Sequence, residues 1–133
     1  LRWANKYGIE IRLKEPEEFA NWVKRWGKMS LGREELPART YYAARGTGKE
    51  HLLDAAFFRA SYIELLDVNQ ESVIIKILNE VGLNAQQILE LAHSEAAKQT
   101  ALEALEEYEK FGCPGVPTWV VEGERFWGKD RVD

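Results

Sequence analysis

The pattern of the sequence changes abruptly at Gly112, and this change constrains the fold more than any other feature. Before Gly112, apolar residues recur at the spacing of amphipathic helices. After it come two short runs of aromatic and β-branched residues, 118–121 and 125–127, which favour β-strands. Glu122-Gly123-Glu124 joins them as the predicted turn of a hairpin, with Gly123 at positive φ. Because an isolated two-stranded hairpin is marginal in water, these strands need a sheet or a helical surface to pack against.

Periodicity and capping signals predict six or seven helices ahead of the hairpin. Asn69, Asn84 and Ser94 are the predicted N-caps, and glycines end several of the helices. The segment 49–66 has a continuous apolar stripe and should form the central helix, whereas 34–45 has a weaker pattern. The predicted helices cover residues 1–7, 16–26, 34–45, 49–66, 70–81, 85–92 and 95–111.

Size and composition limit the classes of protein to which the chain can belong. With 133 residues and 45% hydrophobic side chains, it is long enough for one globular unit with a core of its own. The net charge of -4 creates no field that attracts phosphate backbones, so nucleic acid is not an expected partner. Apolar runs such as Val73-Ile74-Ile75 are far short of a membrane span, and no membrane partner is expected. The single Cys113 favours a reducing, cytoplasmic setting.

Several chemically versatile side chains are better explained by structure. Cys113 follows the C-terminal end of a predicted helix, where the helix dipole disfavours a thiolate, so we expect a small packed side chain. His51 and His93 lie near helix ends without further ligands at metal-binding spacing, and no metal site is predicted. Trp22 and Trp26 share one helical face and should pack in the core. The acidic residues between 103 and 109 should form the solvated side of their helix.

Two motifs frame the hairpin, Gly115-Val116-Pro117-Thr118 before it and Phe126-Trp127-Gly128-Lys129-Asp130-Arg131 after it. Together with the segments 1–8, 55–62 and 69–83, they resemble the DsbA-like thioredoxin-fold family, in the group of 2-hydroxychromene-2-carboxylate isomerases and kappa-class glutathione transferases. The chain resembles the C-terminal two-thirds of such a protein, and the match runs mainly from about residue 50 to the last residue. It implies a mostly helical α+β fold, with a DsbA-like helical insertion domain over 1–111 and the C-terminal hairpin of a truncated thioredoxin fold over 112–133.

The same residues predict one side of a ligand site. The Val116-Pro117 bond at the entry to a strand is expected to be cis, which leaves the Val116 N–H and C=O for pairing with an extended peptide. The resemblance implies that this peptide is glutathione. Asp130 would cap the following helix or accept the ammonium of a γ-glutamyl group, and Arg131 would hold a carboxylate. Lys129 replaces the small polar residue of many relatives, which weakens the match at that contact.

The resemblance implies a glutathione-dependent isomerase or transferase that acts on an aromatic metabolite. The family's strand-helix-strand unit, which brings the catalytic serine or a Cys-x-x-Cys pair, has no counterpart in residues 1–133, so no catalytic residue is assigned and an inactive fragment is one expectation. Two alternatives stay open. One is a thiol-disulfide oxidoreductase of the same superfamily. The other is a non-catalytic binding or assembly module that another chain completes, for which a homo-oligomer is expected.

Overall fold

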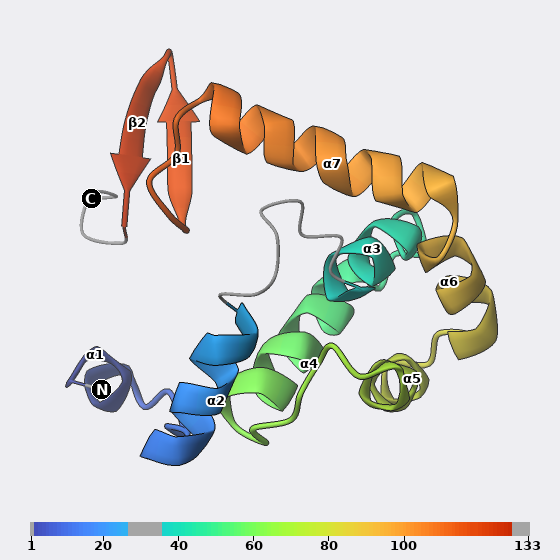
Figure 1. Cartoon of the computed structure of the whole chain (residues 1–133), viewed down its shortest axis with the longest axis horizontal. Helices are drawn as coiled ribbons and strands as arrows, with labels where there is room; N and C mark the ends of the chain where they lie inside the picture. Colours follow the sequence, from blue (N-terminus) through green and yellow to red (C-terminus); the bar gives the residue numbers. More distant parts are fainter. Residues whose placement is uncertain (1, 27–35, 129–133) are drawn as a thin grey trace.

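The computed structural model describes residues 2–26 and 36–128, and in this part of the chain helices precede a small antiparallel sheet (Figure 1). The mostly helical α+β fold predicted from the sequence is confirmed. In Figure 1 the long helix α7 runs from the helical cluster to the hairpin, which stands at the far end of α7. The elements are α1 Arg2–Tyr7, α2 Pro16–Trp26, α3 Leu36–Ala43, α4 Glu50–Tyr62, α5 Glu71–Glu80, α6 Ala85–Ala92, α7 Glu95–Lys110, β1 Thr118–Val121 and β2 Glu124–Trp127.

Two of the three predicted N-caps are confirmed. The Asn84 side chain accepts a hydrogen bond from the Gln87 N–H and begins α6, and the Ser94 hydroxyl accepts one from the Ala97 N–H and begins α7. Asn69 is the exception, because α5 begins after Gln70, which makes no side-chain capping bond. The Asn69 N–H instead donates to the Asp67 carboxylate, so a local turn takes the place of the cap.

The core of the helical part lies between α3, α4, α5 and α6. The predicted stripes of α4 and α5 face it. Its ten buried members are Ala44, Leu53, Ala56, Ala60, Ile74, Ile77, Leu78, Ala85, Ile88 and Leu89. Burial of this apolar surface is the main stabilising term for this part of the fold.

The centre of the helical cluster is α3, and the prediction that the 49–66 helix would be central is wrong in this respect. Helix α3 packs against α4, α6 and α7, whereas α4 packs chiefly against α3 and α5. Small residues allow this close approach, since Thr40 at the inner face of α3 and Ala44 just after it are fully buried. The Thr40 hydroxyl donates to the Leu36 carbonyl at 2.7 Å, so this buried hydroxyl is paired.

The extended link before α2 is held to the end of α4. The Arg12 N–H donates to the Tyr62 carbonyl at 2.8 Å, and the Lys14 side chain donates to the Leu65 carbonyl at 3.4 Å. Basic groups at the C-terminal end of a helix interact favourably with its exposed carbonyls.

None of the described helices is both long enough and apolar enough to cross a lipid bilayer.

The hairpin β1–β2 has a tighter turn than the sequence predicted. Val121 pairs with Glu124, so β2 begins at Glu124 rather than at Arg125 and the loop has only two residues, Glu122 and Gly123. Both loop residues have positive φ, +51° and +86°. This is the backbone of a type I′ turn, whose twist matches that of the two strands.

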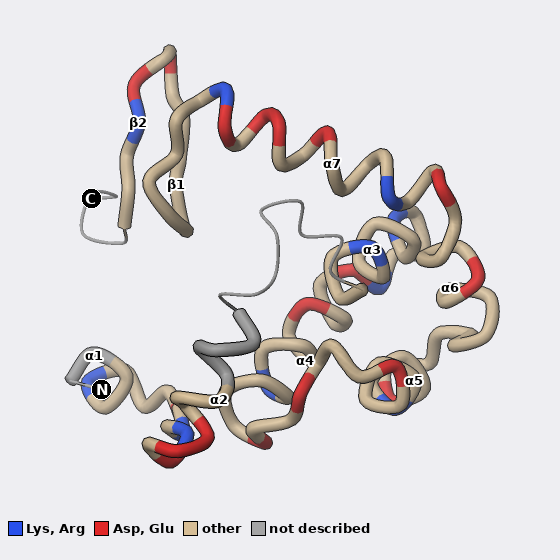
Figure 2. Tube along the Cα trace, viewed as in Figure 1, with Lys and Arg blue, Asp and Glu red and all other residues tan. Residues whose placement is uncertain are grey.

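The acidic residues of α7 are exposed to solvent. Figure 2 shows acidic positions recurring along α7 up to its end beside the hairpin. The predicted solvent side of this helix is confirmed, since Glu103, Glu106, Glu107 and Glu109 are all exposed.

Candidate ligand-binding site

The candidate site is the turn 112–118, which connects the end of α7 to β1. Helix α7 closes with Phe111 as C-cap, and Gly112 follows with φ +58°, a conformation in which glycine is favoured. The Gly112 and Cys113 N–H groups donate to the Glu109 and Tyr108 carbonyls at 2.8 and 3.2 Å. These two bonds pair carbonyl groups in the last turn of α7 that have no partner within the helix. The chain then leaves the helix toward the hairpin.

The two predicted site residues in the described part of the chain lie at the apex of this turn. The Val116-Pro117 peptide bond is cis, as predicted. Val116 is 84% exposed, and its backbone N–H and C=O take part in no hydrogen bond among the described residues. The Pro117 carbonyl accepts a hydrogen bond from the Gly128 N–H at 3.0 Å, which ties the start of β1 to the end of β2. The apex therefore presents one donor and one acceptor to an approaching ligand.

The other two predicted site residues, Asp130 and Arg131, lie outside the described residues, as does Lys129. The structure therefore brings together Val116 and Pro117 and leaves the expected γ-glutamyl contacts as predictions.

Two residues of β2 hold the turn, and the sequence reasoning assigned them to a strand without giving them this role. The Arg125 guanidinium donates to the Phe111 carbonyl at 3.2 Å and also to the Gly112 carbonyl. The Trp127 indole lies against Gly115, so closely that a Cβ at residue 115 would stand 2.8 Å from its Nε1 atom. The sequence signal for this contact is Gly115, which has no side chain and therefore leaves room for the Trp127 indole.

Of the remaining candidates for chemistry, only Cys113 lies in this turn, as a free, half-buried thiol. His93 is the C-cap of α6, and its Nε2 lies 3.1 Å from a carboxylate oxygen of Glu71; His51 is an exposed residue of α4. Within residues 2–26 and 36–128, no group of three or more His, Cys, Asp or Glu side chains could hold a metal ion. The side chains of Trp22 and Trp26 lie outside the described part, so their packing stays a prediction.

Two ionisable groups of the helical part have shifted pKa values. Hydrogen bonds from its own N–H and from that of Gly46 lower the pKa of the Glu50 carboxyl below its usual value. A hydrogen bond to Glu64 raises the pKa of Lys76 above its usual value. The Glu50 contact lies at the start of α4, and Lys76 of α5 bonds to Glu64, which follows the end of α4.

The comparison with known protein families agrees with the fold described above. The sequence profile of the DSBA-like thioredoxin domain matches residues 1–133. The chain belongs to this family. A 2-hydroxychromene-2-carboxylate isomerase of Sphingobium xenophagum is 29% identical to this DsbA-like chain over 132 residues, which are 99% of the chain and 60% of that isomerase. The DsbA-like chain thus spans about three-fifths of the length of the curated relative that it matches. No solved structure matches it.

Proposed function

We propose that this DsbA-like protein is a glutathione-dependent isomerase or transferase that acts on an aromatic metabolite. The observation that carries the proposal is the exposed apex of the turn 112–118, where the Val116 backbone has a donor and an acceptor that no described residue pairs, beside the cis Pro117. The likeness to a 2-hydroxychromene-2-carboxylate isomerase supports the choice of reaction.

The proposed chemistry uses the thiol as a reversible nucleophile. Addition of the glutathione thiolate to an unsaturated aromatic metabolite turns a double bond into a single bond, rotation follows, and expulsion of the thiolate gives the other geometric isomer. Val116 would pair with the backbone of the cysteinyl residue in antiparallel fashion. Asp130 would accept the γ-glutamyl ammonium, and Arg131 would pair with a carboxylate. No described residue of this chain is assigned the task of stabilising the thiolate.

Calorimetric titration of the protein with glutathione tests this proposal, and two substitutions at one position sharpen it. Val116→Pro removes the backbone donor, whereas Val116→Ala keeps it and removes only an exposed side chain. We expect binding to the wild type and to Val116→Ala, with binding to Val116→Pro weakened about tenfold by the loss of one hydrogen bond. Absence of glutathione binding to the wild type would rule the proposal out.

A binding or assembly module remains the second candidate, and one observation favours it. No residue of β1 or β2 is buried among the described residues, so the faces and edges of the hairpin are available to another chain. This function requires a stable oligomer of the 133-residue chain, and a monomeric mass in multi-angle light scattering would count against it. An oxidoreductase activity, by contrast, would require a Cys-x-x-Cys pair in the coding sequence.

A further inference from the structure

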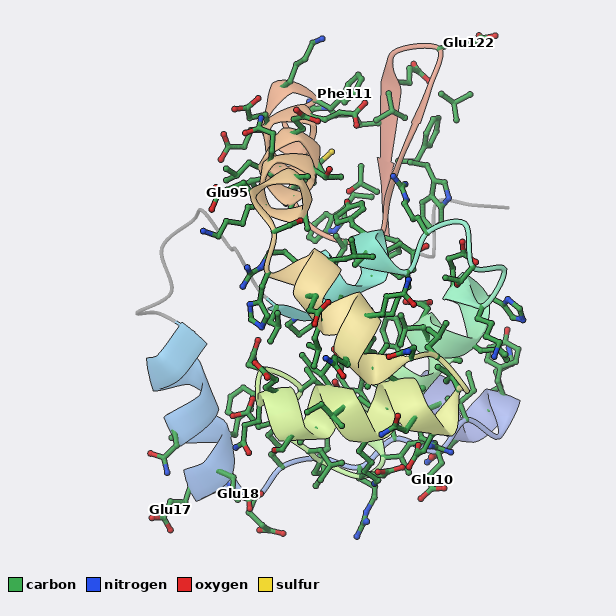
Figure 3. All side chains as sticks on the ribbon, turned by 90° about the vertical axis from the view of Figure 1, so that its right-hand side faces the viewer. Glu10, Glu17, Glu18, Glu95, Phe111 and Glu122 are labelled. Atoms are coloured by element: carbon green, nitrogen blue, oxygen red, sulfur yellow. The ribbon has the colours of Figure 1, made fainter. Side chains whose placement is uncertain are left out.

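Residues 112–117 of the turn lie in no helix or strand, so other contacts must fix the direction of this segment. At its start, the Arg125 guanidinium donates to two carbonyls at the C-terminal end of α7, those of Phe111 and Gly112. A cation at this end of a helix also interacts favourably with the helix dipole. Figure 3 shows Phe111 at the end of α7, with the hairpin rising beside it to the exposed Glu122 at its tip. Arg125 therefore links β2 directly to the point where the chain leaves α7.

The other contacts fix the turn on both sides of Val116. Before it, Gly115 lies under the Trp127 indole, and the Thr118 hydroxyl donates back to the Gly115 carbonyl. After it, the Pro117 carbonyl accepts from the Gly128 N–H. Trp127 is 55% exposed, so burial alone does not explain why it lies against Gly115. Its position follows from the strand register, which pairs Trp127 with Thr118.

We propose that Arg125 and Trp127 are positioning residues for the ligand site, which set the direction of the Val116 backbone donor and acceptor without touching the ligand. In this arrangement β2 acts as a fixed support. Arg125 bonds to the end of α7, and the Trp127 indole contacts Gly115. The Val116 backbone, which lies at the apex of the turn, thereby keeps a single orientation. A preorganised donor and acceptor bind an extended peptide more tightly than mobile ones, because less entropy is lost on binding. The inference about ligand affinity rests on the proposed function, whereas the inference about the turn does not.

The single cysteine of the chain reports on the turn without any ligand. Cys113 is half-buried and adjoins Gly112, so its rate of alkylation by iodoacetamide reports how far the turn exposes the thiol. We expect Arg125→Met to raise this rate about threefold or more, and Arg125→Lys, which keeps a cationic donor, to restore most of the wild-type rate. The matched control is Arg45→Met, because Arg45 lies over the Tyr42 ring in the helical part. Equal alkylation rates in the wild type and in Arg125→Met overturn the proposal.

A substitution at Gly115 tests the contact between Gly115 and the Trp127 indole. Gly115→Ala places a Cβ against the Trp127 indole and displaces one of the two, so it should also speed the alkylation of Cys113. Helix content from circular dichroism, together with the urea midpoint of each variant, separates local opening from global unfolding. A rise in alkylation that merely parallels a fall in the urea midpoint counts against the positioning role.

Glutathione affinity gives the readout that a merely structural contact would not move. We expect Arg125→Met and Gly115→Ala to raise the Kd about fivefold, Arg45→Met to leave it unchanged, and Arg125→Lys to recover most of the affinity. If the wild type does not bind glutathione, the proposed function fails, and the alkylation rates still decide whether Arg125 and Trp127 hold the turn. If glutathione binds the wild type and Arg125→Met equally well, the positioning role is wrong and the proposed function stands.

Discussion

In the helical core, Leu53, Ile74 and Leu78 are fully buried, whereas in the hairpin every residue of β1 and β2 keeps part of its side chain in contact with solvent. The first region is stabilised mainly by the removal of apolar surface from water. The second depends on cross-strand hydrogen bonds, a two-residue turn and the attachment of Arg125 to the end of α7. The candidate ligand groups lie in the less buried region.

This difference separates stability from ligand positioning. Substitutions in the core should change the free energy of unfolding, whereas substitutions around the turn 112–118 should change the geometry of the ligand groups. Local opening costs least where few apolar contacts hold the chain, which is the case for the hairpin and its turn.

The largest expected effect on stability comes from the core. Leu78→Ala removes a side chain that is 0% exposed and leaves a cavity, so it should lower the free energy of unfolding by about 2–5 kcal/mol. Val121→Ala, at a hairpin position 57% exposed, should cost less than about 1 kcal/mol. Urea denaturation followed by circular dichroism measures both variants. Similar losses for the two would contradict the difference between the regions.

An intermediate effect is expected at the start of α7, which connects the two regions. The Ser94 hydroxyl accepts a hydrogen bond from the Ala97 N–H at 3.2 Å and donates to the Leu91 carbonyl at 2.6 Å. Ser94→Ala should therefore lower the free energy of unfolding by about 1 kcal/mol. Ser72→Ala, at an exposed position in the first turn of α5, serves as the control and should have a smaller effect. Equal midpoints for the two variants would show that the cap does not stabilise α7.

The smallest effect depends on pH. The folded pKa of Glu50 lies below its usual value, because backbone N–H groups, its own first and then that of Gly46, donate to the ionised carboxylate. Its contribution to stability is therefore complete above the unfolded pKa and is lost as the pH falls through the folded value. We expect Glu50→Gln to lower the urea midpoint slightly at neutral pH and to match the wild type in strong acid. The control is Glu109→Gln. If Glu50→Gln and the wild type differ in urea midpoint by the same amount at both pH values, this assignment is contradicted.

The sequence predicted most of the element order correctly because the local signals agree with one another. Asn84 and Ser94 begin helices where expected, and Gly82 and Gly112 follow helix ends with positive φ. Asn69 failed as a predicted cap because its side-chain amide, together with its N–H, bonds to the Asp67 carboxylate in a local turn. The cis bond at Val116-Pro117 was also expected from local sequence.

What the sequence by itself determined is the secondary structure, the hairpin, the family resemblance and the backbone half of the candidate site, since each depends on residues close together in the chain. Only the tertiary structure decided that α3, despite its weak periodicity, lies at the centre of the helices. It alone placed Arg125 at the end of α7 and Trp127 on Gly115. These contacts join residues 12 to 14 positions apart, and their geometry depends on strand register and on the direction in which α7 ends, which no local pattern specifies.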